Sequence, residues 1–258
     1  SIFQISKTGH RPQEHLFVVK SIISLYMELK IPIIIQFFDI KKFFDSESLR
    51  DGMNVIYKAG IKGKVYRLWY KLNHRTTITV QTGVGVSDSE ITGENIGQGT
   101  IGGAVVSAAN LDDGISEVFE GSTHEISYGN VGLKPLLYQD DISRMASSRQ
   151  AAQAGLDKIE TAMDLKLLEV HPKKCCYLLI EPKENMMKIR NEIEQNPLRY
   201  KNTTIMERDS EKWLGEMIHK DGIEASVTAT IKDRKGRVKN AIFELNAIIE
   251  DTRMMIIG

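Results

Sequence analysis

Two short apolar segments of this chain each end in acidic residues, and this pattern limits what the chain can fold into more than any other feature. Residues 33–38 are a run of Ile and Phe interrupted only by Gln36, and Asp39 follows directly. Residues 136–138 read Leu-Leu-Tyr, and Gln139 then leads to Asp140 and Asp141. Runs of Ile and Phe are typical of a strand that is buried on both faces. If the two strands are neighbours, their acids meet at one rim of a sheet.

Carboxylates that converge repel one another and therefore need protons or cations. Their oxygens suit hard divalent cations such as Mg²⁺ or Mn²⁺. Two such ions, about 3.5–4 Å apart, can hold the attacking and the leaving oxygen of a phosphoryl transfer. The pattern therefore predicts a two-metal site. The alternative is that Asp39 begins a turn and that Asp140 and Asp141 form an ordinary hairpin turn, because Asp is common in turns.

The rest of the chain mixes helical and strand patterns without a regular order, which favours an α+β domain. Helical periodicity, caps and terminal glycines predict helices over residues 13–30, 45–58, 62–72, 104–119, 151–168, 184–195 and 225–250. Strands are expected at 76–81, 176–180 and 198–206, with hairpins at 133–145 and 211–219. Residues 82–103 contain seven glycines and predict a loop or hairpin region.

The charges balance overall but are unevenly distributed. The chain has 34 Lys and Arg against 34 Asp and Glu, which excludes a uniformly basic surface for nucleic acid but allows a local one. Residues 76–133 contain eight acids and no Lys or Arg, so the remainder carries a net charge of +8. Basic segments occur at 62–75, 173–190 and 232–239. Each alone fits a solvated helix face, but three together favour a groove that follows a phosphate backbone.

The cysteines and the apolar runs exclude other classes. Only Cys175 and Cys176 are present, so a disulfide-rich scaffold and a structural zinc site are not expected. The longest apolar run, residues 31–38, is far shorter than the ~20 residues of a membrane helix, and we therefore expect no membrane partner. Reduced cysteines favour the nucleus or the cytoplasm.

Further motifs surround the two acidic sites. Residues 38–45 read Phe-Asp-Ile-Lys-Lys-Phe-Phe-Asp and match the D-x-x-x-x-[FY]-D motif of reverse transcriptases, whose Y-x-D-D motif matches residues 138–141. Gln98-Gly99 resembles their Q-G motif, residues 171–175 resemble N-P-x-K-T, and Trp213-Leu214-Gly215 resembles the primer-grip turn. Residues 9–17 resemble a segment of non-LTR (LINE-type) elements. Each motif alone is weak, but six in this order resemble the reverse transcriptases of non-LTR retrotransposons, retrons and group II introns.

The resemblance implies a polymerase palm. Such a palm is an antiparallel sheet of the split βαβ type, with helices on one face and the acids on the open face. The expected division is partial fingers over residues 1–32, the palm with inserted fingers helices and the glycine-rich segment over 33–220, and the start of a thumb or a C-terminal helix over 221–258. A full thumb and an endonuclease are expected in a longer parent protein.

The resemblance also implies roles for individual residues. Asp39 and Asp140 are the implied catalytic pair, with Asp141 in a supporting role, and with the Ile40 carbonyl as a further ligand these three carboxylates would bind two Mg²⁺ or Mn²⁺ ions. The implied nucleotide-binding residues are Phe44 as a steric gate that selects dNTPs, Gln98 and Gly99 beside the new base pair, and Lys174 near the triphosphate. The implied template and primer contacts are His10, Arg11, Trp213, Leu214 and Gly215. Phe44 and Trp213 also fit ordinary core side chains, Gly99 a plain loop glycine and Lys174 an exposed lysine.

The implied activity is RNA-directed DNA synthesis, in which a primer 3′-hydroxyl attacks the α-phosphate of a dNTP on an RNA template. The chain departs from the family pattern at several motifs. No proline follows Gln98-Gly99, His171 replaces the usual Asn and Cys175 the usual Thr. These departures leave a second hypothesis open, a catalytically inactive retroelement-derived domain that binds nucleic acid or protein. A nucleotidyl cyclase on the same palm is a third.

Overall fold

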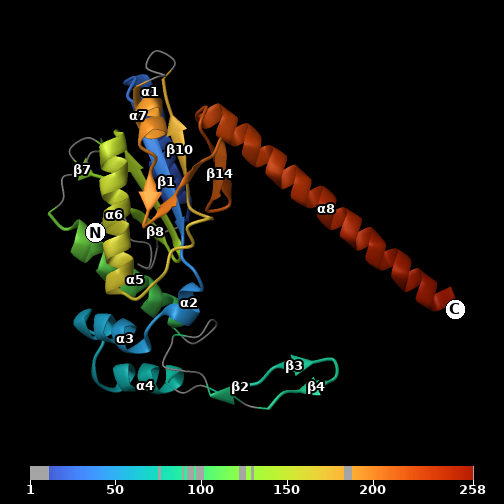
Figure 1. Cartoon of the computed structure of the whole chain (residues 1–258). Helices are drawn as coiled ribbons and strands as arrows, with labels where there is room; N and C mark the ends of the chain where they lie inside the picture. The colour runs from blue at the N-terminus through green and yellow to red at the C-terminus, as the bar shows by residue number, and fades with distance from the viewer. Residues whose placement is uncertain are drawn as a thin grey trace.

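The fold is α+β, as the sequence predicts, and it is built around one mainly antiparallel sheet (Figure 1). The computed structural model describes residues 12–74, 77–88, 90–91, 96, 102–121, 126–128, 131–182 and 188–257. His10, Arg11, Gln98 and Gly99 lie outside the described residues.

The central sheet has five strands in the order β13-β10-β1-β9-β8. The strands are β1 (Ile33–Asp39), β8 (Leu136–Tyr138), β9 (Asp141–Ala146), β10 (Cys176–Ile180) and β13 (Met206–Glu207). β1 lies in the middle and pairs antiparallel with both β9 and β10, whereas β10 pairs in parallel with β13. The Ile- and Phe-rich segment is therefore the central strand, and all of its residues before Asp39 are buried.

Helices α5 (Gly103–Phe119), α6 (Arg149–Leu165) and α7 (Lys188–Gln195) share one apolar cluster with one face of the sheet. Ile34 and Phe38 of β1 belong to that cluster. The buried Gln36 side chain, also on this face, donates to the Ala152 carbonyl of α6 at 3.1 Å and accepts from Arg144. A Cβ at Gly155 would lie 2.0 Å from Arg144, so this glycine lets the arginine pass beneath α6.

The opposite face of the sheet packs against a second apolar cluster. Ile33, Ile35 and Phe37 of β1 pack there against α1 (Pro12–Glu28) and the hairpin of β14 (Ser210–Trp213) and β15 (Glu216–His219). The resemblance implies helices on one face, and three helices do lie there, but α1 covers part of the other face as well. Because side chains alternate along a strand, Asp39 also points to this second face.

The expected helix over residues 45–58 is wrong in its bounds, because the chain forms two helices there. α2 (Phe43–Ser46) ends at the buried Glu47, and α3 (Leu49–Lys58) begins after Ser48. The Ser48 hydroxyl accepts from the Asp51 N–H at 3.3 Å, so Ser48 caps a new helix instead of continuing the first. α4 (Gly63–Asn73) follows.

The expected strands over 76–81 and 198–206 are each broken. The first becomes β2 (Thr77–Ile78), which pairs with β5 (Glu90–Ile91), and β3 (Gln81–Thr82), which pairs with β4 (Gly85–Val86). The second becomes β11 (Arg199–Tyr200), β12 (Thr203–Thr204) and β13, because Lys201 turns the chain with a φ of 51°. A further small hairpin joins β6 (Ser127–Tyr128) and β7 (Val131–Gly132).

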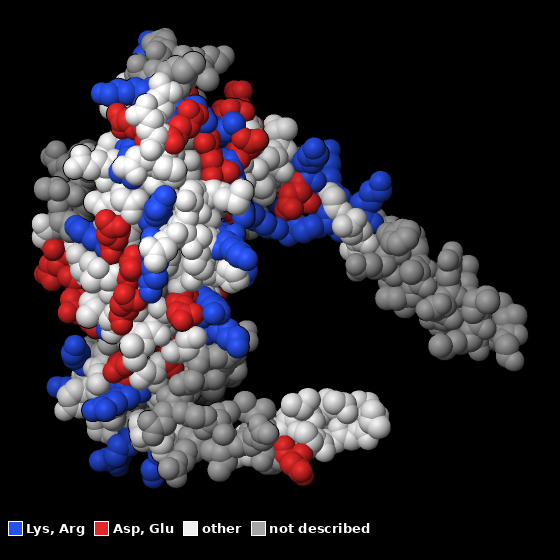
Figure 2. Space-filling view, viewed as in Figure 1, with Lys and Arg blue, Asp and Glu red and all other residues white. Residues whose placement is uncertain are grey.

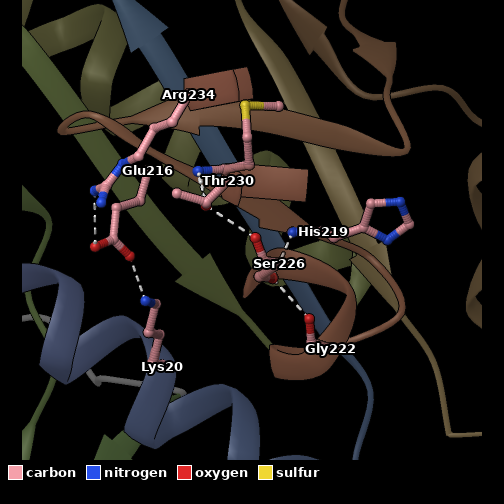
Figure 3. Close-up of polar contacts among 8 residues, drawn as sticks. Lys20, Glu216, His219, Gly222, Ser226, Thr230 and Arg234 are labelled. Atoms are coloured by element: carbon pink, nitrogen blue, oxygen red, sulfur yellow. Dashed lines mark hydrogen bonds and ion pairs between the residues drawn. The ribbon is translucent and has the colours of Figure 1, made fainter. Parts of the chain in front are cut away.

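The last helix, α8 (Ile223–Ile257), is anchored to the edge of β15 by hydroxyl groups (Figure 3). The backbone N–H of Met217 donates to Thr230 Oγ1 at 2.9 Å, and that of His219 donates to Ser226 Oγ at 2.8 Å. Glu216 lies between Lys20 of α1 and Arg234 of α8 and contacts both cations. The first turns of α8 are therefore fixed, and its later part extends away from the sheet (Figure 1). Within the described part of the chain, no helix combines the length and apolar character needed to cross a membrane.

Candidate active site

Two of the predicted carboxylates meet at the end of the sheet. Asp39, the last residue of β1, lies directly opposite Asp141, the first residue of β9. Residues opposite each other in antiparallel strands have neighbouring side chains on one face. Asp140 precedes Asp141 in the turn from β8, where Gln139 has a φ of 55°. The structure therefore brings Asp39 and Asp141 together across the ladder and places Asp140 beside them in the turn.

Burial and neighbouring negative charge both disfavour the ionised form of Asp141. Together they raise the pKa of this carboxyl to about 6; burial contributes most, followed by the charges of Asp140, Asp39 and Glu211. A cation placed among these groups would relieve the same repulsion. The electrostatics of this rim are therefore those of a cation site.

Lys174 supplies a positive charge at the rim. Its Nζ lies 3.0 Å from Asp39 Oδ2, with 60% of the lysine side chain exposed. The loop that carries Lys174 is tied to the end of β1, because the His171 N–H donates to the Asp39 carbonyl at 2.8 Å and the Lys41 N–H donates to the Glu169 carbonyl at 2.7 Å. These two hydrogen bonds surround Ile40 and neither uses its carbonyl, which the resemblance implies as a metal ligand.

A cavity of about 240 Å³ opens beside the two aspartates. Acidic, basic and aromatic side chains line it together: Phe37, Phe38, Asp39, Asp141, Ile142, Lys174, Arg208, Glu211, Lys212 and Trp213. Three carboxylates and three cations thus share one concave surface. Such a surface can accept a ligand that carries both bound cations and phosphate groups.

Sequence reasoning missed Arg208, Glu211 and Lys212. Glu211 contacts Arg208 and accepts from the Cys176 thiol at 3.2 Å, which places it over the sheet next to the aspartates. The signal that could have found Glu211 is strand alternation, because residues two apart on a strand share a face and Trp213 was already singled out.

The predicted primer-grip residues form a tight hairpin turn. Leu214 and Gly215 connect β14 to β15, and both have positive φ values, 49° and 84°. Trp213 is buried, with its ring centroid 6.2 Å from that of His15 and 6.3 Å from that of Phe37. Trp213 is therefore a packed core residue that also forms part of the cavity wall.

The predicted nucleotide residues are only partly described. Phe44 lies on α2, is half-buried, and packs against the cluster beneath the sheet with its ring 5.3 Å from that of Phe43. It is not among the residues that line the cavity. The described residue nearest to Gln98 in sequence is Ile96, which is fully buried and donates its N–H to the Glu47 carbonyl at 3.0 Å.

The carboxylates at the rim suit an Mg²⁺ ion that is bound partly by substrate and water, and not a metal ion that is fully enclosed by protein ligands. Among the described residues, no group of three or more His, Cys, Asp or Glu side chains is arranged to hold a metal ion. Mg²⁺, however, is usually bound through one or two carboxylates plus substrate phosphates and waters. Two opposed carboxylates on an open rim match that pattern, and so does the excess negative charge around Asp141.

Comparison with known families and proteins agrees with this geometry. Residues 5–218 match the family described as reverse transcriptase (RNA-dependent DNA polymerase). A curated relative is the retrovirus-related Pol polyprotein from type-1 retrotransposable element R2 of Nasonia vitripennis, which is 25% identical over 189 residues. That alignment covers 71% of this chain but only 18% of the relative.

The solved structures that resemble the chain are telomerases. The apo telomerase of Candida tropicalis, truncated from its C-terminal domain, has a TM-score of 0.56 at 12% sequence identity. The alignment covers 84% of this chain and 41% of the telomerase chain. The telomerase of Candida albicans, in complex with a fragment of telomeric RNA, has a TM-score of 0.55 at 10% sequence identity. That alignment covers 81% of this chain and 33% of the telomerase chain. At such low sequence identity the structural similarity is evidence of the fold alone, which is a palm-like polymerase fold. The chain spans less than half of each of these proteins.

Proposed function

The chain belongs to the reverse transcriptase family, and on that premise we propose that it is the catalytic core of an RNA-directed DNA polymerase of the non-LTR retrotransposon type. The likeness to the R2 polyprotein supports this branch. The observation that carries the proposal is the pairing of Asp39 with Asp141 beside Lys174 at the edge of a cavity. The reaction is the attack of a primer 3′-hydroxyl on the α-phosphate of a dNTP, with pyrophosphate as the leaving group.

In this proposal the carboxylates of Asp39, Asp140 and Asp141, with the Ile40 carbonyl, hold two Mg²⁺ or Mn²⁺ ions. Such ions, when bound, neutralise the attacking and leaving oxygens of the displacement. Asp39 and Asp141 face the cavity and fix the place of the reacting phosphate. Lys174 pairs with Asp39 here and is free to turn to a phosphate once Asp39 has another partner. Its ammonium group would then give a proton to the departing pyrophosphate, which leaves as the bond to the α-phosphate breaks.

Other cavity residues contribute binding. Arg208 and Lys212 line the same cavity and can pair with phosphates of the dNTP or of the primer strand. Phe44, Gln98 and Gly99 are proposed to contact the nucleotide, with Phe44 excluding a 2′-hydroxyl. Trp213, Leu214 and Gly215 are proposed to support the primer end through the rigid turn of the hairpin, and His10 and Arg11 to touch the template.

Primer extension on an RNA template with Mg²⁺ tests the proposal. We expect D39N and D141N each to reduce incorporation of dNTP at least about 100-fold, because each removes a charge that the transition state requires. Glu192→Gln is the matched control, since Glu192 is an exposed carboxylate on α7 behind the sheet, and it should retain full activity.

Three outcomes would overturn the proposal. Equal incorporation by wild type and both aspartate variants would show that the carboxylates are not catalytic. Salt-dependent RNA binding by a wild-type chain that does not extend primers would instead favour the inactive nucleic-acid-binding domain. Formation of a cyclic product from a single NTP would identify a cyclase.

A further inference from the structure

Glu47 is a fully buried carboxyl group that lies outside the catalytic cavity. It follows α2 and stands three residues after Phe44. Its Oε2 accepts from Asn110 Nδ2 of α5 at 2.7 Å. Its other oxygen, Oε1, and the Oδ1 of Asn110 are both buried without a hydrogen-bond partner among the described residues. Two unpartnered acceptors in a buried amide–carboxyl pair are unfavourable, because each has lost its water.

One proton would satisfy both orphaned oxygens. A neutral carboxylic acid has an O–H donor, and a primary amide has both a donor and an acceptor. The acid O–H can donate to the amide oxygen while the amide N–H donates to the acid carbonyl. The second of these bonds is already present between Glu47 and Asn110. The unpartnered Oε1 and Oδ1 are the atoms that the first bond would join.

The surroundings of Glu47 favour its neutral form. Lys166, at the end of α6, is the cation that acts on Glu47, but its Nζ lies 2.7 Å from Asp113 Oδ2 and is already paired. Asp51 of α3 acts in the opposite sense. Burial is the dominant influence and raises the pKa of Glu47 to about 8.

Glu47 also connects the segments that carry the proposed nucleotide residues. Its N–H donates to the Phe43 carbonyl at 3.2 Å, next to Phe44. Its carbonyl accepts from Ile96, two residues before Gln98. Its side chain bonds to α5, which begins four residues after Gly99. Three contacts of one residue therefore join the Phe44 segment to both flanks of the Gln98-Gly99 segment.

We propose that Glu47 is a positioning residue whose neutral carboxylic acid forms a double hydrogen bond with the Asn110 amide, and that this pair sets the position of Ile96 and α5, the described flanks of the Gln98-Gly99 segment, relative to Phe44. The acid–amide pair stands on the buried contact alone. Its kinetic consequence rests on the proposed polymerase function. Glu47 does not touch the substrate in this scheme and acts only through the two segments that it holds.

Infrared spectroscopy tests the pair independently of any activity. We expect the difference spectrum between wild type and E47Q at neutral pH to contain the carbonyl band of one protonated carboxylic acid. That band should shift in N110A, which removes the amide partner. A carboxylate band in place of the acid band would overturn the proposal.

Steady-state primer extension tests the positioning role. Glu47→Gln replaces the acid–amide pair by an amide–amide pair, so its KM for dNTP should stay within about two-fold of wild type. N110A and E47A should raise this KM about ten-fold, with a smaller change in kcat, and should weaken the discrimination against NTPs. The double variant E47Q/N110D exchanges acid and amide, rebuilds the same pair, and should recover the wild-type KM even if E47A does not fold.

The outcomes separate the two proposals. An unchanged KM in folded N110A would overturn the positioning role while leaving the polymerase function intact. A wild-type chain that extends no primer would overturn the kinetic role together with the polymerase function. The infrared band decides the acid–amide pair in either case.

Discussion

At the scale of single residues, Lys174 gives the most direct argument that the rim is a catalytic site and not an ordinary acidic surface. It is exposed and yet pairs with Asp39 at 3.0 Å. An exposed ion pair contributes little to stability, so the position of Lys174 has no clear structural benefit. The proposed role at the reacting phosphates would explain it.

The first prediction therefore concerns Lys174→Gln. If the lysine gives a proton to pyrophosphate, kcat should fall about 100-fold while the KM for dNTP changes much less. Its neighbour Lys173 is also exposed, and Lys173→Gln is the matched control, with near wild-type kcat expected. A K174Q enzyme with a raised KM and a normal kcat would show that the lysine binds the triphosphate without donating a proton.

The second prediction concerns the stability cost of the acidic rim at Asp141. Its pKa in the folded chain, about 6, lies above its ordinary value of 3.8, so folding favours the neutral acid. This stabilising contribution is fully present below pH 3.8 and is lost as the pH rises through about 6. At neutral pH the ionised carboxylate therefore destabilises the fold.

Replacing Asp141 by Asn should accordingly raise the free energy of unfolding by about 1–3 kcal/mol at neutral pH and by much less below pH 3.8. Urea denaturation at both pH values measures the difference. The same variant should lose polymerase activity, because it removes a carboxylate that is proposed to hold the metal ions. A D141N chain that is no more stable than wild type at neutral pH would show that the rim is not strained by its charges.

At the level of elements, the junction of α8 with β15 determines where the last helix points. β15 is an edge strand, and its outward N–H groups at Met217 and His219 bond to the hydroxyls of Thr230 and Ser226. These two side chains are four residues apart and so share one face of α8. The helix thereby satisfies a strand edge that would otherwise be open.

The third prediction is that S226A/T230V detaches this helix start. Each change leaves a backbone N–H without its partner and should cost about 1–3 kcal/mol. Hydrogen exchange measures the effect directly, because the amides of Met217 and His219 should lose protection before those of β1. Thr228 is exposed on the same helix, and T228V should change neither quantity. Equal protection of both amides in S226A/T230V would show that apolar packing alone fixes α8.

The elements also show what sequence patterns can and cannot specify. The strand over 176–180 was predicted with its observed bounds, and β1 was predicted one residue short, because buried runs of apolar residues carry their own signal. The helix break at Glu47 was missed, because Ser48 caps a new helix there and the buried partner of the Glu47 side chain, Asn110, lies 63 positions away. Likewise Asp39 and Asp141 follow from strand ends, whereas Glu211 enters the site only through the packing of a distant hairpin on the sheet.

For the whole molecule, charge is separated between parts of the surface. Lys and Arg side chains gather along the described first half of α8 and along the edge of the body that faces the hollow between α8 and the β3–β4 hairpin (Figure 2). Residues 76–133, which include that hairpin, have no Lys or Arg. A nucleic acid in the hollow would therefore be held from α8 and from that edge of the body, and not from the hairpin.

The fourth prediction follows from the spacing of three exposed lysines, Lys232, Lys235 and Lys239. Positions i, i+3 and i+7 lie on one face of a helix, so all three can follow a single strand of phosphates. Replacing them together by Gln should weaken RNA binding and reduce the slope of log affinity against log salt by about 2, because each phosphate contact contributes about 0.7–0.9 to that slope. Fluorescence anisotropy at several salt concentrations measures both quantities.

A matched control distinguishes this face from a general loss of positive charge. Lys30 and Lys58 are exposed on other parts of the molecule, and replacing both by Gln should leave the salt slope unchanged. If the two sets of variants lose affinity equally for each charge removed, the binding is diffuse and α8 has no special role. If the salt slope falls only in the α8 variant, α8 is the surface that contacts the phosphates. The hydrogen bonds of Ser226 and Thr230 would then also serve RNA binding, because a helix that can swing freely cannot hold its lysines in register with a phosphate backbone. In that case S226A/T230V should lower the RNA affinity even though it removes no charge.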